Sequence, residues 1–389
     1  MRVLSLSTLY PNDQTPNFGI FVERQMQAVA ARGDVDLVMV NPIGLPPFPI
    51  SLHPRYRALR SLPSIEQRGA VQVLRPRFRL LPRIGGRFNA AAEARAVLPL
   101  AQRLHAEAPF DLIDAQFFYP DGPAAVSLAK ALGLPCSIKA RGADIHHWGT
   151  SSGTSDQVRR AAQDATALLA VSGGLADDIA ALGVPRSKVT IHRTGLDRAV
   201  FCPRDKAQSR DALGLPHDRP VLACVGALIP RKGQRYAIEA LAQLPDAILV
   251  LAGTGPDEAE LKALADTLEL TDRIRFLGSV PHGDLPVVLS AADIFVLPTA
   301  SEGLANAWVE ALACGTPVVT TPIAGARELL TNPAWGEMVA RDKLPIAIAI
   351  SQILADPPSR KTVAAGAAPF SWEKNAEALV DHWRHLAAK

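Results

Sequence analysis

The chain has 389 residues, of which 48% are hydrophobic and 20% charged, and its formal net charge at pH 7 is +3. This length is too great for one typical core and fits two domains, and the composition excludes a disordered chain. No apolar run reaches the length of a membrane span, the N-terminal segment lacks a signal peptide's cleavage site, and the four cysteines have neither zinc-site nor disulfide spacing, so we expect a cytoplasmic protein.

Short apolar runs alternate with helical segments along the first half of the chain. We expect strands at 3–7, 35–40, 112–114, 136–139, 167–171 and 189–191, and helices at 21–32, 123–132, 157–165 and 174–182. Ser172 is the expected N-cap of the last of these helices. The alternation is typical of a parallel sheet covered by helices on both faces.

Basic residues gather between 51 and 110, where eleven arginines stand against three glutamates. The proline-rich apolar segment 42–50 comes directly before them. An apolar loop beside arginines is how a soluble protein rests on an anionic membrane surface, and Arg55 to Arg87 would supply the contacts. A solvated face of an arginine-rich protein is the other interpretation. Nucleic acid is not an expected partner, because aromatic residues are sparse here and no nucleic-acid motif occurs.

A proline-containing charged stretch near 193–205 interrupts the alternation, and we place the linker there. The pattern resumes with strands at 221–226, 247–252, 274–277, 294–297 and 318–320 and helices at 236–244, 256–268, 283–291 and 305–314. The predicted fold class is therefore α/β, with Rossmann-like domains at 1–200 and 201–368 facing each other across a cleft. A last helix within 369–389 is expected to pack back on the first domain.

Two carboxylates eight residues apart flank the start of the helix predicted at 305–314. Glu302 lies in a glycine-containing loop after the strand 294–297, and Glu310 lies in the second turn of the helix. Eight helical residues rotate by about 80° beyond two turns, so two helical glutamates at this spacing would not share a face. The pair can act on one ligand only with Glu302 in the loop.

The start of the same helix offers backbone donors to a ligand. The N–H groups of Leu304, Ala305 and Asn306 are expected to lack helical partners and to suit an anion such as a diphosphate. The flanking carboxylates suit the hydroxyls of a ribose or a hexose. The pattern therefore predicts a sugar-nucleotide site, and two solvated surface glutamates are the alternative.

Cations are expected at the same edge of the second sheet. Arg231 and Lys232 follow the strand at 221–226 and precede a helix, which places them in the layer of Glu302. Adjacent cations there can neutralise a diphosphate leaving group, and no metal-ligand cluster is visible in the sequence to do so. An ordinary charged loop is the alternative interpretation.

The first domain contributes candidate residues from loops that follow its strands. Gly19 lies in the polar loop after the first strand, where a glycine lets a ligand approach the backbone. Gln116 and Arg141 also follow strands and are expected to line the first wall of the cleft. For Arg141, a buried salt bridge to Asp144 is the alternative.

At these residues the chain resembles the retaining GT-B glycosyltransferases of glycosyltransferase family 4. The resemblance covers nearly the whole chain and is strongest from Val225 to Leu330, through the segments 226–233, 253–256, 276–278, 292–298, 302–303 and 310–319. It implies a GT-B fold and a nucleoside diphosphate sugar as donor, without a cofactor or a metal. The site residues that it implies are Glu310 for the ribose, Glu302 with Gly303 for the donor sugar, Lys232 with Arg231 and the Leu304 to Asn306 amides for the leaving diphosphate, and Gly19 opposite that diphosphate.

The chain departs from the family pattern at two positions. Members commonly carry a histidine where this chain has Gln116, and an arginine where Ala227 stands. A glutamine can hydrogen-bond to sugar and phosphate but cannot carry a proton. The loss at Ala227 removes one phosphate contact, and we expect Arg231 to carry more of that role.

The resulting hypothesis is a glycosyltransferase that moves a hexose with retention to a hydroxyl acceptor. The expected acceptor is a lipid-linked or polysaccharide precursor of a cell-surface glycan, met at the inner face of the membrane. A GT-B sugar-nucleotide epimerase and a non-catalytic or regulatory sugar-nucleotide-binding protein are the competing hypotheses. Gln116 and Ala227 favour the non-catalytic one, whereas an epimerase needs acid–base residues that the sequence does not reveal.

Overall fold

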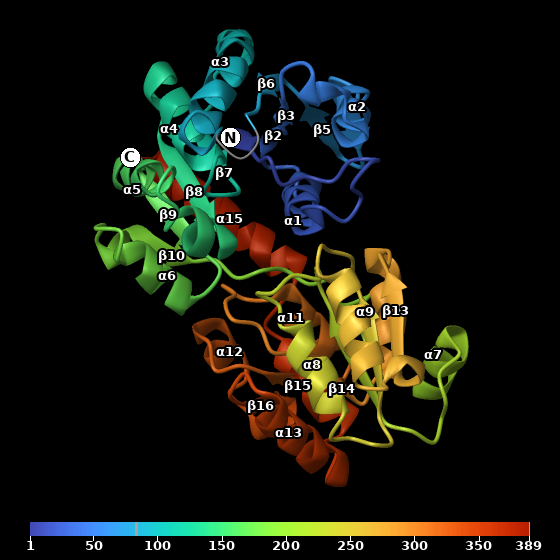
Figure 1. The fold of residues 1–389 in the computed structure, drawn as a ribbon. Helices are drawn as coiled ribbons and strands as arrows, with labels where there is room; N and C mark the ends of the chain where they lie inside the picture. Colours follow the sequence, from blue (N-terminus) through green and yellow to red (C-terminus); the bar gives the residue numbers. More distant parts are fainter. Residues whose placement is uncertain (82–84, 389) are drawn as a thin grey trace. The chain divides into compact units, whose positions relative to one another are not determined.

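The structure of the protein is a computed structural model, which describes residues 1–81 and 85–388. The chain forms two compact units, one of residues 1–195 together with 372–389, the other of residues 196–371. The division therefore follows Gly195 and precedes Trp372, within a few residues of the boundaries expected from the sequence. Figure 1 shows the elements of each unit in the colours of the chain.

Unit 1 is built on a mostly parallel sheet in the order β10-β9-β8-β7-β1-β2-β5-β4, in which the pair β4 and β5 is antiparallel. The strands of this sheet are β1 (Arg2–Leu6), β2 (Asp36–Val40), β4 (Ile65–Arg68), β5 (Val71–Leu74), β7 (Leu112–Ala115), β8 (Cys136–Ala140), β9 (Ala167–Ala170) and β10 (Val189–Ile191). A separate small sheet pairs β3 (Ile43–Leu45) with β6 (Arg77–Arg79). The central strands β7, β8 and β9 are almost fully buried, as expected of a sheet that is covered on both faces.

The helices of unit 1 are α1 (Ile20–Ala31), α2 (Pro54–Arg60), α3 (Asn89–Glu107), α4 (Asp121–Leu132), α5 (Ser155–Asp164), α6 (Gly173–Ala180) and α15 (Trp372–Ala387). Ser172 caps α6 by accepting a hydrogen bond from the N–H of Leu175 at 3.2 Å, so the predicted N-cap is confirmed. Helix α3 was not predicted, because alanines and arginines with Pro99 in their midst give it a weak periodic pattern.

Unit 2 has a parallel sheet in the order β13-β12-β11-β14-β15-β16. Its strands are β11 (Val221–Val225), β12 (Ile248–Ala252), β13 (Ile274–Gly278), β14 (Ile294–Leu297), β15 (Val318–Thr320) and β16 (Gly336–Met338). Its helices are α7 (Lys206–Leu213), α8 (Gln234–Leu241), α9 (Glu258–Thr267), α10 (Leu285–Ala291), α11 (Asn306–Ala313), α12 (Ala324–Leu329), α13 (Lys343–Ala355) and α14 (Arg360–Ala364).

Helix α15 belongs to unit 1 although it follows unit 2 in the sequence. It packs against α1, and its buried residues Leu379, Val380 and Trp383 share a core cluster with β1 and β2. The indole Nε1–H of Trp383 donates to Oδ1 of the buried Asp114 at 3.0 Å. The last helix therefore completes the core of the first unit, as the predicted fold class stated.

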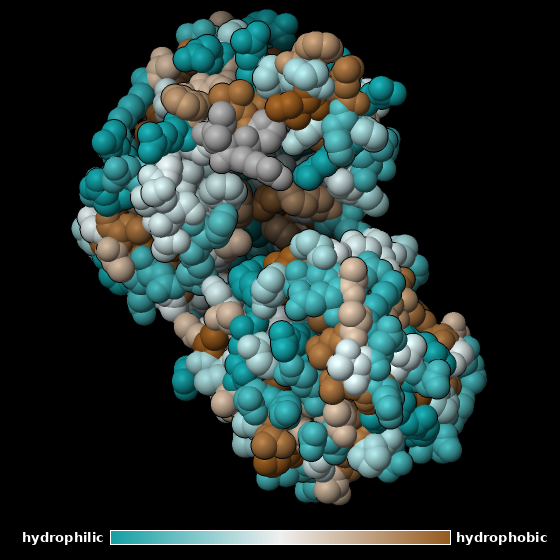
Figure 2. Space-filling view, in the orientation of Figure 1, coloured by the Kyte–Doolittle hydropathy of each residue, from teal (hydrophilic) through white to brown (hydrophobic). Residues whose placement is uncertain are grey.

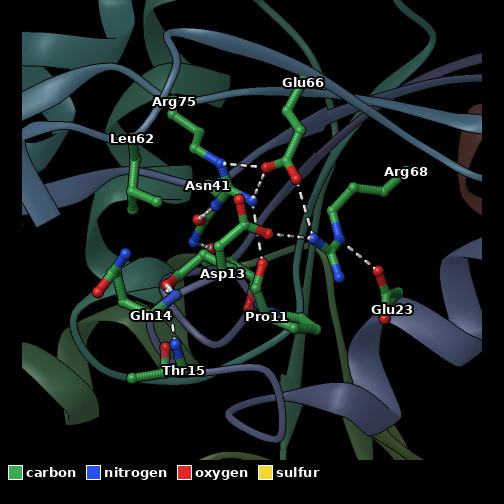
Figure 3. A network of polar contacts seen from close by, with 12 residues as sticks. Pro11, Asp13, Gln14, Thr15, Glu23, Asn41, Leu62, Glu66, Arg68 and Arg75 are labelled. Atoms are coloured by element: carbon green, nitrogen blue, oxygen red, sulfur yellow. Dashed lines mark hydrogen bonds and ion pairs between the residues drawn. The ribbon is translucent and has the colours of Figure 1, made fainter. Parts of the chain in front are cut away.

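The arginine-rich segment is only partly a surface feature. Arg75 is 1% exposed and donates to Asn41, to the carbonyl oxygen of Pro11 at 3.0 Å and to Oε2 of Glu66 at 2.6 Å, as Figure 3 shows. Arg68 pairs with Glu23 at 2.5 Å and with Glu66 at 2.9 Å. These side chains fasten the loop after β1 to β4 and β5.

The predicted membrane surface therefore needs correction. Arg75 cannot reach a membrane, and Arg77 donates internally to the carbonyl oxygens of Arg75 and Leu62. Arg83 lies outside the described residues. The exposed arginines of the segment are Arg55, Arg57, Arg60, Arg79, Arg87, Arg95 and Arg103. Within the described parts of the chain, no helix combines the length and apolar character needed to cross a bilayer.

Candidate functional site

The loops that carry the predicted donor residues meet because of the strand order in unit 2. β11 pairs with β12 on one side and with β14 on the other, so the strand order reverses there. The loops after β11 and β14 therefore leave the sheet next to each other, where ligands bind in open α/β sheets. One loop carries Arg231 and Lys232, and the other carries Glu302.

Glu302 lies between the two predicted cations. Its Oε1 is 2.6 Å from Nη1 of Arg231 and 2.6 Å from Nζ of Lys232, and its side chain is 13% exposed. Burial alone would raise the pKa of this carboxyl, but Lys232 and then Arg231 lower it below its ordinary value. The structure thus brings together three predicted residues and keeps the carboxylate ionised.

A close backbone approach and an arginine fasten these two loops to each other. Gly233 precedes α8 with φ 79°, and a side chain at this position would lie 2.2 Å from the carbonyl oxygen of Pro298. Arg341 donates to the carbonyl oxygens of Pro298 at 2.7 Å and Pro230 at 2.5 Å while its guanidinium lies over the ring of Tyr236. Arg341 was missed from the sequence, because an arginine that bridges distant loops belongs to no local motif.

Glu310 lies on α11, as predicted, and is already held by a histidine. Nε2 of His282 is 2.9 Å from Oε1 of Glu310. The imidazole ring of His282 also contacts the buried ring of Phe201, with centroids 4.9 Å apart. His282 thus occupies one carboxylate oxygen of Glu310 and holds the carboxylate in position. No sequence pattern indicated His282, which lies 28 positions before Glu310.

The backbone at the start of α11 has open donors. Across the described residues, the N–H groups of Leu304, Ala305 and Asn306 find no backbone or side-chain acceptor. The N-cap residue Ala305 has no side chain that could satisfy them. Gly303, Leu304 and Ala305 are themselves buried. The predicted backbone donors are therefore available to an anion, whose charge the helix dipole also favours.

In unit 1, Gln116 is fully buried, although it was expected to line a cleft wall. Its Oε1 accepts from Nε2 of Gln25 at 2.6 Å and from Nη2 of Arg141 at 2.7 Å. Its Nε2 donates to Oδ2 of Asp114 at 2.6 Å. Both ends of the amide are thus bonded within the protein, and Gln116 holds other side chains in place.

Arg141 follows β8 and does not form the salt bridge that was the alternative interpretation. Among the described ion pairs none joins Arg141 to Asp144, whose carboxylate accepts the backbone N–H groups of Arg141, Gly142 and Phe118. The guanidinium instead bonds Gln116 and lies 4.7 Å from the centre of the Phe21 ring. Burial lowers the pKa of Arg141 to about 10.

Gly19 precedes α1 with φ 76°, and a side chain here would lie 2.5 Å from the carbonyl carbon of Leu9. Packing of the loop after β1 is a sufficient reason for this glycine. Its proximity to a diphosphate stays a prediction.

A pocket of about 550 Å³ opens in unit 1 beside the loop after β1. Aromatic side chains form much of its wall, including Tyr56, Tyr119 and Trp148. Its polar residues include the amides Asn12 and Asn41 and the cation Arg55, and no Asp or Glu occurs among the described residues that line it. Aromatic faces and amides suit the apolar and hydroxyl surfaces of a sugar ring.

Comparison with known proteins decides the family. The family model "Glycosyl transferases group 1" matches residues 205–369, and "Glycosyl transferase 4-like domain" matches residues 19–195. The putative teichuronic acid biosynthesis glycosyltransferase TuaC of Bacillus subtilis is 30% identical over 85% of this chain and 83% of its own length. The chain belongs to the group 1 glycosyltransferases.

Solved structures agree on the fold of this group 1 glycosyltransferase. Sucrose-phosphate synthase from Thermosynechococcus elongatus matches with a TM-score of 0.82 and 22% identity over 100% of this chain and 99% of that one. Anabaena HepE in complex with UDP and glucose matches with a TM-score of 0.75 and 20% identity over 99% of this chain and 100% of that one. The predicted GT-B fold is confirmed.

Proposed function

We propose that this group 1 glycosyltransferase moves a hexose from a nucleoside diphosphate sugar to a hydroxyl acceptor, with retention and without a metal. The observation that carries the proposal is the ionised Glu302 between Arg231 and Lys232. Glu302 lies in the loop that leads into α11, the helix that carries Glu310. This cluster combines hydrogen-bond acceptors for sugar hydroxyls with cations for a leaving group.

Each part of the cluster has a role in this reaction. Glu310 accepts hydrogen bonds from the ribose, and Glu302 accepts them from the transferred sugar. Arg231, Lys232 and the open N–H groups that begin with Leu304 stabilise the charge that develops on the leaving diphosphate. The bond from the anomeric carbon to the diphosphate breaks while the acceptor oxygen attacks the same face, and the acceptor proton passes to the leaving phosphate oxygen.

The acceptor is a precursor of a cell-surface polysaccharide, lipid-linked in its membrane-bound form. The name of the Bacillus subtilis relative, which refers to teichuronic acid biosynthesis, supports this class. The aromatic and amide-lined pocket in unit 1 supports a sugar as the group that the acceptor presents.

An exposed apolar segment supports attachment to the inner face of a membrane. Phe48 is 78% exposed, Ile50 49% and Leu52 50%, and the arginines of α2 follow at once. Figure 2 shows apolar side chains gathered over the part of unit 1 that contains α2. Apolar side chains that enter the interface beside cations that meet anionic headgroups form a peripheral membrane contact.

Donor turnover tests the enzymatic proposal. The purified protein is incubated with UDP-, GDP- and ADP-sugars in the presence and absence of EDTA, and slow hydrolysis or transfer is followed by chromatography. We expect turnover of one donor class that EDTA does not change, and α-linked product from an α-linked donor. Tight donor binding without turnover, even with candidate acceptors, would favour the non-catalytic hypothesis.

Vesicle sedimentation at low salt tests the membrane contact. Phe48→Ser with Leu52→Ser, or Arg55→Gln with Arg57→Gln, should each reduce binding to vesicles that contain phosphatidylglycerol. Arg95→Gln, on an exposed face of α3, is the matched control and should bind as the unaltered protein does. Equal sedimentation of all variants contradicts the proposed surface.

A further inference from the structure

Arg141 holds one edge of its guanidinium against the protein and leaves the other edge open. We infer that Arg141 is a binding residue for an anionic group of a substrate, and that Gln116 is the positioning residue that aims it. The inference rests on the proposed function only in that the anion belongs to one of the two substrates. It concerns unit 1 alone.

The guanidinium is fixed in a plane by three contacts. Nε donates to the carbonyl oxygen of Gln116 at 2.8 Å, and Nη2 donates to Oε1 of the same residue at 2.7 Å. The ring of Phe21 lies 4.7 Å below it. Within the described residues, Nη1 of Arg141 has no hydrogen-bond acceptor, and the residue is partly exposed. A guanidinium group that is fixed along one edge loses little conformational freedom when an oxyanion binds its other edge.

In the described parts of the chain, no carboxylate forms an ion pair with this guanidinium. The carboxylate of Asp144 already accepts three backbone N–H groups, of Arg141 at 3.0 Å, Gly142 at 2.8 Å and Phe118 at 3.0 Å. Asp114, on the neighbouring strand, accepts from Gln116, Ser5 and Trp383. A pKa of about 10 leaves Arg141 protonated at neutral pH. The open edge therefore carries a positive charge that a bound anion would balance.

The orientation of the Gln116 amide follows from its neighbours. The guanidinium of Arg141 only donates hydrogen bonds, so the amide oxygen of Gln116 must face it and the amide nitrogen then faces Asp114. That oxygen also accepts from Gln25 at 2.6 Å. A neutral imidazole has one acceptor nitrogen and could not receive both donors in this way. The glutamine thus fits this network where a histidine would not.

A phosphate and a carboxylate both fit this open edge, because a guanidinium binds either oxyanion through charge-assisted hydrogen bonds. The anion can therefore be the diphosphate of the donor or an acidic group on the acceptor, and the experiment separates the two sources.

The test compares Arg141→Gln, Arg141→Lys and Gln116→Leu with the control Arg95→Gln. Affinities for UDP, GDP and ADP are measured by calorimetry, and thermal shifts are recorded with inorganic pyrophosphate. With the donor phosphate as the anion, Arg141→Gln weakens the best-bound nucleoside diphosphate about 10- to 100-fold, and Arg141→Lys weakens it less. With an acceptor anion, nucleotide affinity stays the same, while the KM of an acidic acceptor rises and that of a neutral one does not.

A double-mutant cycle tests the positioning role of Gln116. Gln116→Leu should weaken anion binding in the unaltered protein but have little further effect when Arg141→Gln is present, whereas a merely structural role gives additive effects. The inference is overturned when Arg141→Gln leaves the affinity for the nucleoside diphosphates and for pyrophosphate unchanged and also leaves the KM of an acidic acceptor unchanged. Pyrophosphate stabilisation that depends on Arg141, without any sugar transfer, would retain the inference and refute the proposed function.

Discussion

The substitution Glu302→Gln tests the electrostatics of the proposed donor site in the absence of substrate. It removes the carboxylate that both Arg231 and Lys232 contact at 2.6 Å, and it leaves the two cations next to each other. Loss of a hydrogen-bonded, mostly buried charge costs about 1 to 3 kcal/mol after the relief of its desolvation. In a unit of this size that corresponds to a decrease of about 2 to 12 °C in Tm.

The pH dependence of this difference has a defined sign. Folding lowers the pKa of Glu302 below its ordinary value of 4.5, so its contribution to stability is present above that pH. The contribution disappears as the pH falls through the lower folded pKa. We therefore expect the Tm difference between the unaltered protein and Glu302→Gln to be largest near pH 7 and to narrow below about pH 4.5.

Differential scanning fluorimetry between pH 3.5 and 8 measures this difference. The control is Glu258→Gln, in an exposed helical pair with Lys262 in the same unit, which should change stability by less than about 0.5 kcal/mol. A nucleoside diphosphate should raise the Tm of Glu302→Gln more than that of the unaltered protein, because its charge replaces the lost carboxylate. Equal stability of the two proteins at pH 7, or a difference independent of pH, would refute the reasoning.

Three further substitutions test other parts of the structure. His282→Ala should weaken nucleoside diphosphate binding about 3- to 10-fold in calorimetry, because Glu310 loses the partner that holds it. Tyr10→Phe should leave the Tm unchanged or raise it, because the buried hydroxyl has no hydrogen-bond partner among the described residues. Glu93→Gln should stabilise the protein more at pH 8 than at pH 5. Burial raises the pKa of Glu93 and that of its neighbour Asp121, the latter to about 7, so both carboxyl groups are easier to bury when protonated. As the pH rises, the folded protein must bury the charged forms, and the substitution removes one of these charges.

The positions of the proposed donor-site residues were predictable because they follow from local rules. Strands that end in glycine-containing loops place Lys232 and Glu302 at one edge of a parallel sheet, and helix periodicity separates Glu302 from Glu310. The sequence could not show His282 or Arg341, because each acts through a contact with a segment distant along the chain.

The arginine-rich segment shows what could not be predicted from composition. Charge density alone suggested a surface, yet Arg75 is buried because Glu66 and Asn41 come from neighbouring strands to meet it. From the sequence, Gln116 was only a departure from a family pattern. Its hydrogen bonds to Gln25 and Arg141 show that it belongs to a buried polar network. Whether a polar residue is buried depends on its tertiary partners, which composition does not reveal.

The place of α15 also determines the order in which a growing chain can fold. Residues of α15 that close the core around β1 and β2 are synthesised after unit 2, so the N-terminal unit lacks Trp383 and its hydrogen bond to Asp114 while unit 2 is being made. Unit 2, which is continuous in sequence, can complete its own core first. A ribosome-bound chain that stops before Trp372 would carry a finished unit 2 and an N-terminal unit with an open core. The uncovered apolar surface of the N-terminal unit would be a target for chaperones until α15 is synthesised.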